Sequence, residues 1–156
     1  ADADEEFVGS NVADTILAGS GNDLLSGGAG SDVLTGGDGD DVFVFTQATD
    51  SDTITDFGLD ADRIDISSLI RDFDSVRLIA EGIEKGGADL FLDYCAMRKN
   101  GNSSDITIAV TQVEDDAVLR ITSSSPIVGT ALADLNLTIT LEDVDGLCLT
   151  LDDFIL

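Results

Sequence analysis

Large apolar residues recur every nine positions along the first third of the chain. Leu25, Leu34 and Phe43 form the regular series, and Ile16 extends it toward the N-terminus. Only one residue on either side of each apolar position separates it from polar, glycine-rich sequence, which leaves room for no more than short strands. The pattern therefore predicts short strands that alternate with polar loops, with the strands at Leu24–Ser26, Val33–Thr35 and Val42–Val44.

The polar loops repeat the order G-G-x-G-x-D, and each aspartate stands two positions before an apolar residue. This order fits the calcium-binding nonapeptide G-G-x-G-x-D-x-U-x. Three loops, at 18–23, 27–32 and 36–41, keep the pattern, and a fourth at 9–14 keeps the aspartate but loses the inner glycines. The sequence therefore contains four repeats, of which the first is degenerate.

Glycine and aspartate suit a calcium site for different reasons. Glycine lets backbone carbonyls approach an ion closely, and aspartate supplies a carboxylate. Calcium accepts about 6–8 oxygen ligands in a flexible arrangement, whereas soft metals are disfavoured because the chain has no histidine and both cysteines lie far from the loops. The candidate ligands in the intact repeats are Gly19, Gly21, Asp23, Gly27, Gly28, Ala29, Gly30, Asp32, Gly36, Gly37, Gly39 and Asp41.

Two nonapeptides make one turn of a parallel β-roll, so loops eighteen residues apart are predicted to stack and to share an ion. This pairs Asp23 with Asp41, and Asp14 with Asp32. Asp50 follows Asp32 by the same eighteen residues and predicts a further site where the repeats end. With Asp56 and Asp62 of the following segment as additional candidate ligands, we expect about 2–4 calcium ions.

Two other readings of the loops are disfavoured. A flexible Gly/Asp/Ser linker would have no reason to keep aspartate and a large aliphatic residue at fixed positions of a nine-residue period. An EF-hand is excluded because the loop at 38–41 lacks the D-x-D-x-D-G order and the glutamate at loop position 12.

The remainder of the chain is also β-rich. Residues 1–6 are expected to be a frayed lead-in, and residues 52–67 to close the roll with Ile54, Phe57, Ile64 and Ile66 inward and with Asp65 or Ser67 capping a brief helix through Leu69 and Ile70. Alternating apolar and polar residues then predict antiparallel strands with one wet face. The predicted strands are 76–79, 89–94, 106–110, 118–121, 135–141 and 147–151, and the loop 95–105 is expected to protrude.

The fold class is therefore all-β, with a parallel β-roll of nonapeptide repeats followed by a β-rich antiparallel capping region. Two parts are expected, the roll and its closing segment at 1–71 and the cap at 72–156.

The charge and composition of the chain limit the classes of partner that it could bind. A net charge of −25, from 32 acidic and 7 basic residues, argues against nucleic acid or an anionic membrane. The 43% of hydrophobic residues argues for a chain that folds once cations neutralise the loops, so folding is expected to be coupled to calcium.

Targeting signals and cysteines add little to this picture. The chain has no run of ~18 apolar residues, no signal peptide and no initial methionine, which predicts no membrane span and suggests a fragment or processed product. Cys95 and Cys148 could form a disulfide, but a buried free thiol is favoured at Cys148 because apolar residues flank it.

The residues carry a family resemblance. The repeats of 18–44 and the continuation Asp41–Phe45, Asp52–Phe57 and Asp62–Ser67 resemble the RTX calcium-binding β-roll modules of proteins exported by bacterial type I secretion, such as the C-terminal domains of serralysin-type proteases and the R-modules of alginate epimerases. The final Asp152–Leu156, acidic and then apolar, is similar to the uncleaved secretion signal of serralysin-type proteins. The resemblance implies a secreted, extracellular protein.

A catalytic role is not expected, because the chain has no histidine and no G-x-S-x-G or H-E-x-x-H motif. The leading hypothesis is a non-catalytic module that passes through the type I secretion machinery unfolded and folds outside the cell where calcium is millimolar. The alternatives are a polysaccharide-binding module that assists an upstream enzyme, which the alginate-epimerase resemblance implies, and the terminal domain of an adhesin. For the polysaccharide the available cations are Arg63, Arg71, Arg77, Lys85, Arg98, Lys99 and Arg120.

Overall fold

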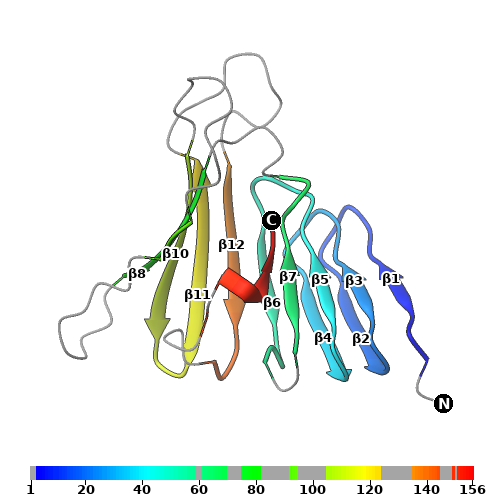
Figure 1. Cartoon of the computed structure of the whole chain (residues 1–156). Coiled ribbons are helices and arrows are strands. Elements are labelled where there is room, and N and C mark those ends of the chain that lie inside the picture. The colour runs from blue at the N-terminus through cyan, green and yellow to red at the C-terminus, as the bar shows by residue number, and fades with distance from the viewer. Residues whose placement is uncertain are drawn as a thin grey trace.

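The computed structural model describes residues 3–58, 61–69, 75–81, 92–94, 105–123, 135–144, 149 and 151–156. These residues form an all-β protein built on two sheets (Figure 1). The elements are β1 (Glu6–Val8), β2 (Thr15–Ser20), β3 (Leu24–Ser26), β4 (Val33–Asp38), β5 (Val42–Val44), β6 (Ser51–Ile54), β7 (Arg63–Asp65), β8 (Ser75–Glu81), β9 (Leu92–Tyr94), β10 (Asp105–Val113), β11 (Asp116–Ser123), β12 (Asn136–Leu141), the 3-10 helix η2 (Leu151–Asp153) and β13 (Phe154–Ile155).

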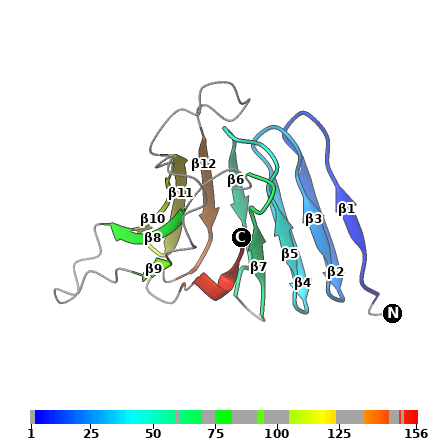
Figure 2. The same ribbon diagram turned by 45° about the horizontal axis from the view of Figure 1, so that its top comes forward.

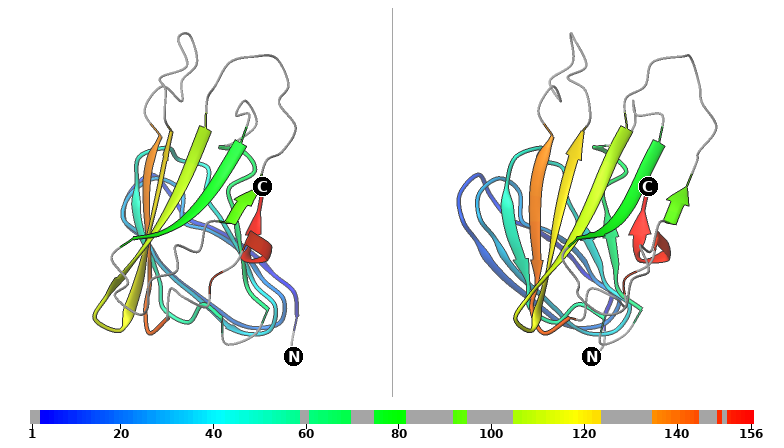
Figure 3. Two further views of the ribbon diagram at one scale, coloured as in Figure 1. Left: turned by 60° about the vertical axis from the view of Figure 1, so that its left-hand side comes forward. Right: turned by 90° about the vertical axis from the view of Figure 1, so that its left-hand side faces the viewer.

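The first seven strands wind as a parallel roll. Successive strands alternate between the sheets, so that β1, β3, β5 and β7 pair in one sheet and β2, β4 and β6 in the other. Leu25 pairs in register with Phe43, and Ile16 with Leu34, each eighteen residues apart. The predicted strands are confirmed, although β4 continues to Asp38, and so are the predicted two nonapeptides per turn. Figure 3 shows the successive turns stacked one behind another.

The apolar member of each repeat points between the two sheets. Leu25, Leu34 and Phe43 are fully buried, and they belong to one core that continues through the strands of the C-terminal half. The ring centroids of Phe43 and Phe57 lie 6.2 Å apart, so the closing segment packs directly on the last repeat. The predicted inward orientation of the closing segment is confirmed for Ile54, Phe57, Ile64 and Ile66.

Strands from beyond residue 71 extend both sheets of the roll. β12 pairs in parallel with β6, and β11, β10, β8 and β9 follow in the same sheet. On the other sheet β13 pairs in parallel with β7, where Phe154 stands opposite Ile64 (Figure 2). The hydrogen bonding of both sheets therefore runs on from the roll into the C-terminal strands.

The antiparallel prediction for these strands is confirmed at β10–β11, β11–β12 and β8–β9. It is wrong at β8–β10 and at β6–β12, which are parallel. Alternation of polar and apolar residues marks the two faces of a strand but not the direction of its neighbour, so the sequence pattern could not distinguish the two arrangements.

Three local predictions need correction. The first residues are not a frayed lead-in for the part described, because β1 pairs with β3 and the Glu5 N–H donates to Asp23. Asp65 accepts a hydrogen bond from the Ser67 N–H at 2.9 Å, but the described residues 67–69 form a turn rather than a helix. Leu151 begins a 3-10 helix instead of ending a strand; the rest of that predicted strand except Leu149, most of the loop 95–105, Ile70 and both cysteines lie outside the described residues.

Alanine substitutions at two glycines would test how tightly successive turns stack. Both Gly19 (φ 121°) and Gly37 (φ 107°) have a positive φ, but a Cβ on Gly37 would meet the Gly19 carbonyl oxygen whereas a Cβ on Gly19 would meet nothing. Gly19→Ala should therefore cost only backbone strain, about 1–3 kcal/mol. Gly37→Ala should cost a further ~1–3 kcal/mol because one turn must move away from the next. Urea unfolding in saturating calcium measures both, and equal losses would contradict the stacking.

Candidate metal centres in two columns of loops

The loops of the roll stack in two columns at opposite ends of the strands (Figure 1). We call the loops that lead into β3, β5 and β7 the odd column, and the loops that lead into β2, β4 and β6 the even column. Each loop delivers one repeat aspartate to the start of the next strand. These aspartates are buried in all turns but the first.

The aspartates of the odd column form a ladder along the roll. The Asp23 Oδ1 accepts the Glu5 N–H at 2.7 Å, the Asp41 Oδ1 accepts the Asp23 N–H at 2.8 Å, and the Asp62 Oδ1 accepts the Asp41 N–H at 3.0 Å. Each carboxylate is thus tied to the backbone of the preceding turn by a charge-assisted hydrogen bond. The predicted stacking of Asp23 with Asp41 is confirmed, and Asp62 joins the same column.

The even column carries a second ladder with one unexpected member. The Asp32 Oδ1 accepts the Asp14 N–H at 2.8 Å, as the predicted pairing requires. The next rung is Asp52, whose Oδ1 accepts the Asp32 N–H at 2.9 Å. The prediction that Asp50 stacks on Asp32 is therefore wrong, because the spacing lengthens from 18 to 20 residues in the last turn and shifts the register of β6 by two.

In two of the three intact repeats, the first glycine makes room for the carboxylate of its own loop, whereas the repeat at 18–23 begins with Ala18. A Cβ on Gly27 would meet the Asp32 Oδ2, and a Cβ on Gly36 would meet the Asp41 Oδ2. The carboxylate therefore turns back over its own loop, toward the backbone of the glycine segment. A side chain at either glycine would therefore displace the aspartate of the same repeat.

The second carboxylate oxygen distinguishes the degenerate repeat from an intact one. In the first turn the Asp14 Oδ2 accepts the Ser10 N–H at 2.6 Å and the Ser10 hydroxyl at 2.8 Å. The Asp32 Oδ2 is buried and has no hydrogen-bond partner. Burying an unpartnered carboxylate oxygen is unfavourable, so the Asp32 loop fits a cation better than the Asp14 loop does.

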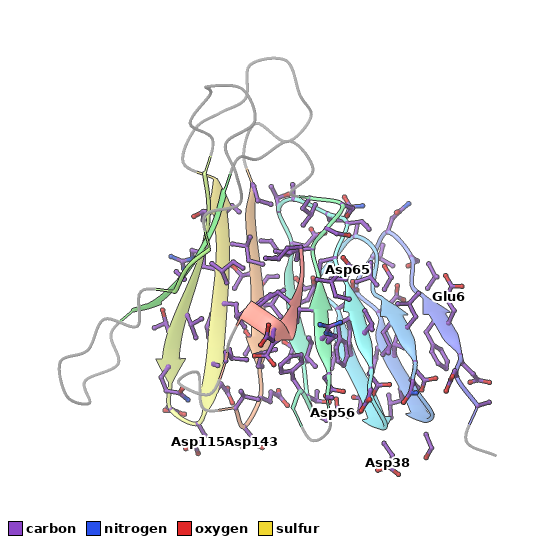
Figure 4. The ribbon with its side chains drawn as sticks, in the orientation of Figure 1. Glu6, Asp38, Asp56, Asp65, Asp115 and Asp143 are labelled. Atoms are coloured by element: carbon purple, nitrogen blue, oxygen red, sulfur yellow. The ribbon has the colours of Figure 1, made fainter. Side chains whose placement is uncertain are left out.

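The closing segment is tied to the loops by two further aspartates. Asp56 accepts the Gly36 N–H at 3.1 Å and the Gly37 N–H at 2.7 Å, one with each oxygen. The Asp62 Oδ2 accepts the Gly58 N–H at 2.8 Å. Figure 4 shows Asp56 at the same end of the roll as Asp38, which is the end where β4 leads into the odd column. Asp56 and Asp62 therefore accept hydrogen bonds from backbone N–H groups of the roll and of the closing segment. Their role as metal ligands stays a prediction.

An outer ladder in the odd column was missed from the sequence. The Asn22 N–H donates to Asp4 at 2.9 Å, the Asp40 N–H donates to Asn22 at 2.9 Å, and the Ala61 N–H donates to Asp40 at 3.3 Å. The signal was available, because Asn or Asp precedes the repeat aspartate at 22 and 40 but Ala or Ser precedes it at 13 and 31. The two columns are thus chemically different.

Burial and crowding perturb two of the stacked carboxylates. Burial raises the pKa of Asp41 to about 6, partly offset by the hydrogen bond from Asp23 and reinforced by the charges of Asp62, Asp23 and Asp56. Burial likewise raises the pKa of Asp52 to about 6, offset by the hydrogen bond from Asp32 and reinforced by the charges of Asp32 and Asp50. Without a counter-charge, each ladder therefore opposes its own ionisation.

The donor set points to a hard cation. Among the described residues no three Asp, Glu, His or Cys side chains are grouped so that they alone could hold a metal. An ion in either column would therefore depend on backbone carbonyl oxygens as well as on one or two carboxylates. Calcium accepts such a mixture, because it takes several oxygen ligands in variable geometry. The buried, unpartnered Asp32 Oδ2 and the glycine cradle around it fit this ion.

A parallel roll of nonapeptides with carboxylate ladders along both loop columns defines the class of protein, a β-roll module. Residues 8–132 match the family described as "Peptidase M10 serralysin C terminal", and the chain belongs to this family. A search of curated proteins found no match.

Two solved structures are similar to the whole chain. The AlgE6R3 subunit of the Azotobacter vinelandii mannuronan C5-epimerase has 24% identity and a TM-score of 0.51, over 99% of this chain and 80% of that one. The AlgE6R2 subunit has 24% identity and a TM-score of 0.55, over 99% of this chain and 88% of that one. The resemblance and the all-β class inferred from the sequence are thereby confirmed, and a calcium-binding β-roll domain is supported. Within the described residues, no helix has the length and apolar character needed to cross a membrane.

The raised pKa values predict how acid affects the metal-free protein. The Asp41 and Asp52 carboxyls have a pKa of about 6 when folded against 3.8 ordinarily, so the folded state binds more protons between these values. Their contribution to stability is fully present below about pH 3.8 and is lost as the pH rises through about 6. In chelator, the β-sheet circular dichroism signal should therefore increase when the pH falls from 7.5 to 5.

Asp41→Asn separates this effect from the general loss of negative charge on acidification. The variant keeps the hydrogen bond to the Asp23 N–H but cannot ionise. It should be more folded than the wild type at pH 7.5 in chelator and should respond less to acid. A wild-type signal that does not change with pH, or a variant with the same pH response, would contradict the assignment.

Proposed function

We propose that this chain is a non-catalytic, calcium-dependent folding module. About 2–4 calcium ions bind between stacked loops, with carboxylates from both ladders and carbonyl oxygens from the glycine segments as ligands. Asp23 and Asp41 serve the odd column, and Asp14 and Asp32 serve the even column. Residues 1–71 supply the metal-binding roll, and residues 72–156 form the β-rich cap on it.

The observation that carries the proposal is the stack of buried carboxylates. Asp23, Asp32 and Asp41 are each no more than 2% exposed, and the Asp32 Oδ2 has no donor at all. In a chain of net charge −25, such a stack is unfavourable until cations compensate it. An ion that binds the stacked loops but not the unfolded chain would favour folding by mass action.

The proposed setting is outside the cell after type I secretion. A chain that stays unfolded at low calcium could be threaded through an exporter, and millimolar calcium outside would then fold it. Sites with affinities near 10⁻⁴–10⁻³ M would respond over this range. The acidic and apolar residues Asp152–Leu156, which resemble a secretion signal, support this setting.

Circular dichroism against calcium concentration tests the folding switch. The wild type should lack most of its β-sheet signal in chelator and gain it cooperatively at about 10⁻⁴–10⁻³ M calcium. Asp32→Asn should move the midpoint to higher calcium by about tenfold, because it removes a charged ligand. The matched control is Asp115→Asn, which removes one charge from the exposed turn between β10 and β11, away from the roll (Figure 4).

Two results would overturn the switch. One is a wild type that is fully folded in chelator and whose melting temperature does not respond to calcium. The other is an equal shift of the calcium midpoint by Asp32→Asn and Asp115→Asn, which would make net charge the cause and not ligation by the loop.

A second candidate function is polysaccharide binding. It is favoured by the structural similarity to two subunits of a mannuronan C5-epimerase, and disfavoured by the charge of −25 against an anionic polymer. Of the cations with described side chains, Arg63 on β7 donates to the Asp152 carbonyl at 3.3 Å and Arg120 on β11 is exposed in the other sheet. The two do not share a sheet, so they give no evidence of a basic stripe.

Titration of alginate oligomers at saturating calcium separates the two functions. Polysaccharide binding predicts measurable heat and NMR shift changes, which should weaken on Arg120→Ala if that exposed cation contributes. No heat and no shift change at millimolar oligomer would leave the folding switch as the function.

A further inference from the structure

We propose that the last loop of the even column, residues 45–50, holds a calcium site of its own in which Asp50 joins Asp32, and that this site couples the roll to β12. The inference rests on the proposed function, because it assumes that calcium binds the roll. It adds Asp50, which lies outside the repeats, as a ligand, and it predicts that calcium in this site stabilises the docking of β12.

Two buried oxygens mark the site. Among the described residues, the Asp32 Oδ2 and the Asp50 Oδ2 are the buried side-chain oxygen or nitrogen atoms that have no hydrogen-bond partner. Asp32 is 2% exposed, so water does not compensate its carboxylate. Both orphan oxygens belong to the last two loops of one column, where a single cation between stacked loops would satisfy both.

The shift of register places Asp50 where the repeat has a glycine. β4 pairs with β6 at an offset of 20 residues, with Val33 opposite Thr53. The same offset aligns Asp52 with Asp32 and Asp50 with Gly30. In the preceding turn a Cβ on Gly30 would crowd the backbone at Val12 and Ala13, whereas the last turn has a carboxylate at that level.

Asp50 lies immediately before β6, two residues ahead of Asp52, and is half-buried with its Oδ2 fully buried. Within β6, Asp52 and Ile54 face the interior of the roll, because both are buried. The Asp52 Oδ1 accepts the Asp32 N–H at 2.9 Å, so the Asp52 carboxylate links the last two loops of the column, to which the buried Oδ2 atoms of Asp32 and Asp50 also belong.

The loop that presents Asp50 is also the loop on which β12 docks. The Asn136 N–H donates to the Ala48 carbonyl at 2.7 Å, and the Thr138 N–H donates to the Asp50 carbonyl at 2.9 Å. Asp50 therefore has its backbone carbonyl bonded to the C-terminal sheet and its side-chain Oδ2 buried. An ion that fixes Asp50 would hold the edge onto which β12 and the strands beyond it add.

Asp50→Asn in the full chain tests the site, since it keeps the shape of the side chain and removes its charge. At saturating calcium, native mass spectrometry or equilibrium dialysis should find one calcium ion fewer than in the wild type. Hydrogen exchange of the β12 amides should be about tenfold faster, because the docking loop is no longer fixed, while the β3–β5 amides keep their protection. Asp115→Asn should change neither quantity.

The outcomes distinguish this proposal from the folding switch. A wild type that binds no calcium would overturn both. A wild type that binds calcium, with an Asp50→Asn variant that binds just as many ions, would overturn only the Asp50 site.

A measurement on the wild type covers the case in which Asp50→Asn does not fold. The ¹³C shift of the Asp50 carboxyl should move when calcium is titrated at constant pH into folded protein, in parallel with that of Asp32. An Asp50 carboxyl shift that does not respond to calcium would overturn the site.

Discussion

The constraint on which this structure depends is the stacking of like charges. Each turn of the roll places a carboxylate beneath the one before it, held by the backbone N–H of the previous turn at 2.7–3.0 Å. These hydrogen bonds position the carboxylates but remove little of their charge. Burial then raises the pKa of Asp41 and of Asp52, and the charges of neighbouring aspartates reinforce the rise. This burial and the net charge of −25 are the electrostatic reasons for the external cation proposed above.

The glycines of the repeats allow the loops and carboxylates to stack this closely. At Gly27 and Gly36 there is no room for a side chain between a loop and its own aspartate, and at Gly37 there is none between one loop and the next. The repeat therefore has glycine at positions where carboxylate or carbonyl oxygens approach the backbone closely. Where the first repeat has Ser10 in the glycine segment, the serine donates two hydrogen bonds to Asp14 and occupies the oxygen that a cation would use. In the degenerate repeat, the Asp14 Oδ2 therefore has hydrogen-bond donors within its own loop, which the Asp32 Oδ2 lacks.

The roll could be predicted from the sequence because apolar residues and aspartates recur in it every nine positions. Leu25, Leu34 and Phe43 identified the inward face, and Asp23 and Asp41 identified the column. The last turn could not be read in this way, because the two additional residues before β6 are compatible with either Asp50 or Asp52 on the ladder. Only the pairing of Val33 with Thr53 decides between them. Strand direction in the C-terminal half was equally hidden, since alternation is the same for parallel and antiparallel neighbours.

The C-terminal strands complete the roll by using its two open edges. β6 and β7 end the two sheets of the roll, and an unpaired edge is a template for any strand that can reach it. β12 takes the first edge and β13 takes the second, each in parallel with the strand that it meets. The second contact is fastened by Phe154, which is buried in the common core, and by Arg63, whose guanidinium donates to the Asp152 carbonyl. Since β6 and β7 follow Asp50 and Asp62 directly, the loops that hold these aspartates lie immediately before both edges on which the rest of the chain depends.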